Sequence, residues 1–120
     1  MKGEDDTGYI PKSKYHAQPV EIDGVRFDSQ KEARRYSELR LLERAGEIRD
    51  LQYHKVFVLI PDQRIGGKIV EHPVKYEADF CYFTRDGRAV VEDTKGFKTP
   101  DYIIKRKLML YIHKIQIKET

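Results

Sequence analysis

The chain has 120 residues, of which 39% are hydrophobic and 36% are charged, and its formal net charge is +3. This length fits one domain, and the charge allows a nucleic-acid partner without the strongly basic profile of a histone-like protein. The single cysteine, Cys81, excludes an internal disulfide, and its apolar surroundings predict a small buried hydrophobe rather than a nucleophile. No run is apolar enough for a membrane span or a signal peptide, so we expect a cytoplasmic protein without a membrane partner.

The chain begins with a polar stretch that is interrupted by glycine and proline. We expect residues 1–14 to form a flexible tail and residues 15–120 to form a single domain. Asp23 and Gly24 separate two short apolar runs, at residues 20–22 and 25–27. This dipeptide favours a tight two-residue turn, so we expect a β-hairpin here.

The first helix has clear start and stop signals. Ser29 and Glu32 have the spacing of a capping box, and Gly46 follows a run rich in Ala, Arg, Glu and Leu. We therefore expect a helix over residues 31–45.

The rest of the chain alternates strand and turn patterns and contains one more helix. We expect strands at 48–53 and 56–60, a turn at 61–68, a hairpin at 74–95, a helix from Pro100 to about Ile112 with Thr99 as its cap, and a last strand at 115–117. The helix pattern predicts a core stripe of Ile104, Leu108 and Tyr111. This order of elements predicts a mixed α/β domain.

The hairpin at 74–95 contains the most informative residues. A three-residue loop at 85–87 would place Asp79 opposite Asp93, with Gly87 in the left-handed position that such a loop needs. A two-residue loop would instead turn Asp93 to the other face. The sequence favours the three-residue loop, and Lys95 then lies on the same face as Asp93.

Two neighbouring carboxylates and a lysine suit metal-dependent cleavage of a phosphodiester. Close carboxylates stay ionised most easily with a cation between them, and ligation by oxygen alone suits Mg²⁺. Lys95 would hold the attacking water and stabilise developing charge. Solvent-facing Asp and Lys at a strand end are the ordinary alternative, but Asp79 interrupts an apolar strand.

Two further acidic residues leave alternatives open. Glu92 precedes Asp93, so a regular strand sends the two side chains to opposite faces, although a bulge at the strand end could reverse the choice of ligand. Glu32 shares a helix face with Tyr36 and Leu39, which directs a carboxylate toward the core side. Its alternative role is the capping box with Ser29, and both roles are compatible.

Taken in order, these residues resemble the PD-(D/E)XK nuclease superfamily. The match consists of Glu32 on an early helix, Asp79 on a strand, and Asp93-Thr94-Lys95 on the next strand, followed by a helix. Over residues 14–118 the chain is similar to a phage-encoded group of uncharacterised proteins in that superfamily, on the segments Lys14-Tyr15, 23–29, 32–36 and 92–96. One departure is Ala78, which stands where the superfamily often has proline.

The resemblance implies a restriction-endonuclease-like fold, with a central mixed sheet flanked by helices. It implies DNA cleavage that depends on Mg²⁺, with Mn²⁺ as a substitute, and ligands at Asp79, Asp93 and Glu32, with Glu92 as the alternative. In a phage setting it implies recombination, replication or processing of DNA, including branched DNA. A homodimer and other replication or recombination proteins are the partners to consider.

Basic residues around the second predicted helix form a candidate DNA-binding patch, made of Lys98, Lys105, Arg106 and Lys107. A solvated basic face is the alternative. The four histidines show no metal-ligand spacing, which argues against zinc. The second function that we consider is a non-catalytic DNA-binding or assembly module that keeps the nuclease fold.

Overall fold

A computed structural model describes residues 19–120 of the chain. These residues fall into two compact units, divided between Glu38 and Leu39, and each unit is described by itself. The predicted tail at 1–14 lies outside the described residues, and the single domain over 15–120 stays a prediction. Within the described part, no helix is long and apolar enough to cross a membrane.

The first unit contains the predicted hairpin. Strands β1 (Val20–Ile22) and β2 (Val25–Phe27) pair antiparallel, with Ile22 opposite Val25. Asp23 and Gly24 form the turn with φ of 54° and 77°, the left-handed conformation of the favoured two-residue hairpin loops. The hairpin prediction is therefore confirmed.

Helix α1 (Gln30–Arg44) differs from its predicted range by one residue at each end. The backbone N–H of Glu32 donates to Ser29 Oγ at 3.1 Å, as a capping box requires. Oε1 of Glu32 accepts from the backbone N–H of Asp28 at 3.2 Å, one residue before the partner of the standard motif. Gly46 has a φ of 77° just beyond the last turn, where the sequence predicts a terminating glycine.

The second unit is built on a mixed sheet with the strand order β3-β6-β7-β8. Pairs β3–β6 and β6–β7 are antiparallel, whereas β7–β8 is parallel. The bounds are β3 Ile48–Ile60, β6 Val74–Thr84, β7 Ala89–Asp93 and β8 Lys118–Glu119. The described elements thus form an α/β fold with a mixed sheet and two helices, in agreement with the predicted fold class.

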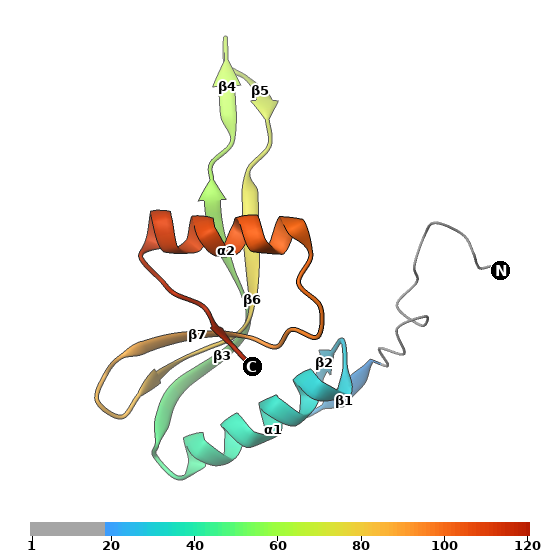
Figure 1. The fold of residues 1–120 in the computed structure, drawn as a ribbon, viewed down its shortest axis with the longest axis vertical. Helices are drawn as coiled ribbons and strands as arrows, with labels where there is room; N and C mark the ends of the chain where they lie inside the picture. The colour runs from blue at the N-terminus through green and yellow to red at the C-terminus, as the bar shows by residue number, and fades with distance from the viewer. Residues whose placement is uncertain (1–18) are drawn as a thin grey trace, which may run out of the picture. The chain divides into compact units, whose positions relative to one another are not determined.

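Three strand predictions were wrong in detail. β3 is one continuous strand rather than two, because residues on both sides of His54 pair with β6. The left-handed φ angles of Asp50 and His54, 58° and 57°, distort the strand without ending it. The predicted turn at 61–68 is part of a second hairpin, β4 (Gln63–Ile65) and β5 (Lys68–Glu71), which extends beyond the paired strands β3 and β6 in Figure 1. The last strand is β8 rather than 115–117, because Lys118 and Glu119 form the parallel ladder with β7.

Helix α2 (Pro100–His113) starts where the sequence predicts. Thr99 Oγ1 accepts from the backbone N–H of Tyr102 at 3.2 Å, and Pro100 occupies the first turn. The predicted core stripe was wrong at Ile104 and Tyr111, which are 58% and 76% exposed, whereas Leu108 packs against the core as predicted. Apolar residues surround most of this helix, so periodicity alone could not identify its buried face.

The buried face of α2 instead presents Tyr102 and Met109 to the core of the second unit. Tyr76, Ala78 and Cys81 of β6 contribute to the same core. The complete cluster of buried residues is Leu59, Tyr76, Ala78, Cys81, Val91, Tyr102, Met109 and Ile117. The candidate site lies against this core.

Candidate functional site

The turn between β6 and β7 sets the register on which the candidate site depends. Thr84 accepts from the N–H of Gly87 at 2.9 Å, and its own N–H donates to Arg88 at 2.8 Å, so residues 85–87 form the three-residue loop. Gly87 has a φ of 86°, as the sequence predicts. The strands remain paired up to Phe80 and Glu92.

Asp79 lies one position beyond the last paired residues of this hairpin. Continuing the register sets Asp79 opposite Asp93, as predicted from the loop length. Asp79 Oδ2 accepts a hydrogen bond from the backbone N–H of Thr94 at 2.7 Å. This bond fixes the Asp79 carboxylate beside the end of β7.

Asp93 is a buried carboxylate with two different oxygen environments. Its side chain is 1% exposed, and Oδ2 accepts a hydrogen bond from the hydroxyl of Tyr76. Oδ1 has no hydrogen-bond partner among the described residues, although Lys95 Nζ lies 3.4 Å away as an ion pair. Burial and the Asp93 carboxylate raise the pKa of Tyr76 well above its usual range, so the hydroxyl keeps its proton and stays a donor.

Lys95 contacts an aromatic ring as well as a carboxylate. Its Nζ lies 4.6 Å from the centroid of the Tyr102 ring, within the range of a cation–π interaction. The Tyr102 hydroxyl in turn donates to Oε2 of Glu119 at 2.7 Å. The ammonium group of Lys95 thus lies near both Asp93 of β7 and the Tyr102 ring of α2, and Tyr102 is itself bonded to β8.

Glu92 has its own setting, separate from that of Asp93. It is fully buried and accepts a hydrogen bond from the hydroxyl of Tyr82. Glu32 belongs to the first unit, where it is 5% exposed and takes part in the cap of α1. The structure thus brings Asp79, Asp93 and Lys95 together within the second unit.

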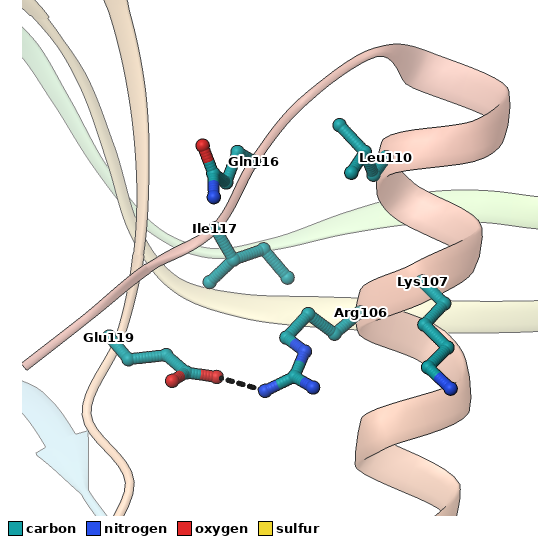
Figure 2. Close-up of a pocket in the computed structure, with 6 residues that line it drawn as sticks. All are labelled: Arg106, Lys107, Leu110, Gln116, Ile117 and Glu119. Atoms are coloured by element: carbon teal, nitrogen blue, oxygen red, sulfur yellow. Dashed lines mark hydrogen bonds and ion pairs between the residues drawn. The ribbon is translucent and has the colours of Figure 1, made fainter.

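The predicted basic patch does not form a uniform solvated face. Lys98 Nζ lies 3.1 Å from Oε1 of Glu119, and Arg106 donates to Oε2 of the same carboxylate at 3.0 Å. Arg106 and Lys107 line a hollow of about 320 Å³ between α2 and the segment that leads into β8, as Figure 2 shows. Lys105 is half-buried on α2.

Three residues of this neighbourhood were missed from the sequence: Tyr76, Tyr102 and Glu119. A regular strand would direct Tyr76 and Asp79 to opposite faces. In β6 the alternation of side chains between the two faces of the sheet is interrupted, since Tyr76, Ala78 and Cys81 all belong to one core. The left-handed His54 lies opposite this change, between the pairs that Tyr53 and Lys55 make with β6.

The donor set is compatible with a hard divalent cation. Asp79 lies opposite Asp93 in the continued register, its Oδ2 accepts from the N–H of Thr94, and Oδ1 of Asp93 is a buried acceptor without a hydrogen bond. Mg²⁺ is commonly held by one or two carboxylates, with water and substrate phosphate as its other ligands. Across residues 19–120, no group of three or more His, Cys, Asp or Glu side chains is placed to hold a metal. Asp79 and Asp93 are therefore the carboxylates that could hold such an ion.

The described residues define an α/β protein with a mixed sheet and a carboxylate–lysine site at the end of a hairpin. The chain belongs to DUF1064, a family described as proteins of unknown function, whose model matches residues 12–120. Comparisons with curated proteins and with solved structures gave no match.

Proposed function

We propose that the chain is a Mg²⁺-dependent DNA endonuclease of the PD-(D/E)XK superfamily, with a restriction-endonuclease-like form of its α/β fold. The observation that carries this proposal is the placement of Asp79, Asp93 and Lys95 at one end of the β6–β7 hairpin. Their order along two antiparallel strands is that of the motif which the sequence resembles. Helix α2 follows β7, in line with the helix that follows this motif.

In this proposal the aspartates bind the metal ion and the lysine orients the attacking water. Asp79 and Asp93 would hold Mg²⁺, or Mn²⁺ in its place, and the bound ion would activate water and neutralise charge on the phosphate. Lys95 orients the attacking water and stabilises the negative charge that develops on the phosphate. Tyr76 fixes the Asp93 carboxylate by its hydrogen bond to Oδ2. The role of Glu32 stays a prediction from the sequence resemblance.

The proposed substrate is DNA, in the recombination, replication or processing of a phage genome. The fold alone does not name the DNA that is bound, and we propose recognition of DNA shape or backbone over a long sequence. A homodimer would place two sites on two strands, and other replication or recombination proteins are candidate partners.

A second candidate function is favoured by the internal partners of Asp93. Its two oxygens already face the Tyr76 hydroxyl and the Lys95 ammonium, an arrangement that can serve a purely structural role. In that case the chain would be a DNA-binding or assembly module without catalysis.

Cleavage assays on the full chain distinguish the nuclease from the non-catalytic module. Labelled linear, single-stranded, flapped and four-way-junction DNA would be incubated with Mg²⁺, Mn²⁺ or EDTA, with RNA as a parallel substrate. The nuclease proposal expects cleavage with either metal and none in EDTA. DNA binding without cleavage under every condition would favour the non-catalytic module.

A further inference from the structure

Three donors contact the carboxylate of Glu119, close to the proposed catalytic site. Its carboxylate accepts from Tyr102 at 2.7 Å and from Arg106 at 3.0 Å, and Lys98 Nζ lies 3.1 Å from its other oxygen. The hydrogen bond from Tyr102, followed by those from Arg106 and Lys98, lowers the pKa of Glu119 to about 2. The carboxylate is therefore ionised at neutral pH.

An ammonium, a guanidinium and a hydroxyl that converge on one anion are also the groups that bind phosphate oxygens. Arg106 and Glu119 line the hollow of about 320 Å³, and Figure 2 shows the guanidinium directed toward the carboxylate from α2. This space offers room beside the donors for an anion larger than a carboxylate. Lys107 lies on the wall of the same hollow.

The position of Glu119 connects this cluster to the proposed site. In the parallel ladder Glu119 is the partner of Asp93, and the backbone N–H of Thr120 donates to the backbone carbonyl of Asp93 at 3.0 Å. Tyr102 contacts Glu119 through its hydroxyl and Lys95 through its ring. A phosphate in the place of the Glu119 carboxylate would therefore lie beside the catalytic residues.

While it stays in place, Glu119 would oppose the binding of DNA, because it neutralises two cations, Lys98 and Arg106, that could contact the backbone. The side chains of Lys98, Arg106 and Glu119 are 48%, 35% and 25% exposed. Ion pairs at this level of exposure contribute little net free energy, so a polyanion can replace the carboxylate.

We propose that Lys98, Tyr102 and Arg106 form a subsite for a backbone phosphate of DNA, and that Glu119 occupies this subsite in the free protein. Binding of DNA displaces the Glu119 carboxylate, which therefore acts as an internal competitor. This inference rests on the proposed DNA substrate, but it concerns binding rather than cleavage.

The test compares the binding of a labelled DNA duplex to the wild type, Glu119→Gln and Glu47→Gln in EDTA, by fluorescence anisotropy. Glu47→Gln is a matched control, because it removes the same charge and an Arg–Glu pair at 3.2 Å that involves Arg85 of the β6–β7 loop. We expect Glu119→Gln to tighten binding about fivefold, and Glu47→Gln to have a much smaller effect. The slope of log K against log salt should stay close to that of the wild type, since the same phosphate contacts form in both complexes once Glu119 is displaced.

A double variant shows whether the gain in DNA affinity depends on the proposed donors. Adding Arg106→Gln to Glu119→Gln should remove the gain in affinity. Glu119→Asp is a second variant, because its shorter carboxylate cannot reach Lys98 and Arg106 together, and it should also tighten binding. Thermal melts of each variant confirm that the protein is folded.

Equal affinity of the wild type and the Glu119 variants for DNA would overturn the inference, and so would an equal gain in Glu47→Gln. A gain for inorganic phosphate alone, measured by competition and thermal shift, would reject DNA as the occupant. Cleavage by the wild type with Mg²⁺ would leave the nuclease proposal standing in either case. The two proposals can therefore fail separately.

Discussion

The hydroxyl of Tyr76 donates a hydrogen bond to Oδ2 of Asp93, and both side chains are buried. A second pair on the same two strands is closely similar, because the hydroxyl of Tyr82 donates to the buried carboxylate of Glu92. The Asp93 carboxylate also forms an ion pair with Lys95 at 3.4 Å. Adjacent acidic residues of β7 thus each accept from a tyrosine hydroxyl, and Asp93 is the one that we propose to act with Lys95.

Replacing each tyrosine in turn distinguishes the role of Asp93 from that of Glu92. Tyr76→Phe and Tyr82→Phe each leave a buried carboxylate without its hydroxyl donor, so each should lower the free energy of unfolding by about 1–3 kcal/mol in denaturant titrations. Only Tyr76→Phe should also reduce Mg²⁺-dependent cleavage, because it releases Asp93. The opposite pattern, with cleavage lost in Tyr82→Phe alone, would identify Glu92 as the catalytic carboxylate.

The register of the β6–β7 hairpin depends on a left-handed residue in its loop. Gly87 has a φ of 86°, and an added Cβ would find Arg49 Nη2 no nearer than 4.0 Å, so Gly87→Ala is costly through backbone strain rather than a clash. We expect a loss of about 1–2 kcal/mol in the free energy of unfolding. Gly96→Ala is the control, since a Cβ there meets nothing within 4 Å and its φ lies outside the left-handed region. Equal stability of the two variants would contradict the three-residue loop.

Cys81 should make the fold sensitive to alkaline pH. Burial raises the pKa of its thiol from 9.0 to about 11, against a smaller opposing effect of Lys55. The thiol ionises first in the unfolded chain, so its contribution to stability is complete below pH 9.0 and is lost as the pH rises to about 11. Denaturant titrations of the wild type and Cys81→Ala across this range should show the difference between them shrinking as the pH rises.

A constant difference between these two proteins, or rapid labelling of the folded wild type by a thiol reagent at neutral pH, would contradict the buried setting of Cys81.

The sequence predicts those parts of the fold that local chemistry controls. Ser29, Thr99 and Gly87 each act within a few residues, so the caps of both helices and the register of the β6–β7 hairpin could be predicted. The alignment of Asp79 with Asp93 followed directly from the loop length. The position of Lys95 beside Asp93 followed from the same register.

The remaining features depend on tertiary contacts that no local pattern reports. The buried face of α2 is set by the packing of Tyr102 and Met109 on the sheet, although other apolar residues also lie along the helix. The contact of Tyr76 with Asp93 depends on the changed alternation in β6. Glu119 joins the site through a parallel ladder between residues that are distant in sequence.

The measurement that tests the central claim most directly is the rate of Mg²⁺-dependent DNA cleavage by the wild type, Lys95→Ala and Lys75→Ala. Lys75 is an exposed lysine on β6 of the same sheet, so its replacement removes the same charge. We expect Lys95→Ala to lose at least about 10²-fold in rate, because the group that stabilises charge on the phosphate is gone, while Lys75→Ala retains the wild-type rate. Equal cleavage by all three proteins, or no cleavage by any of them, would contradict the proposed nuclease site.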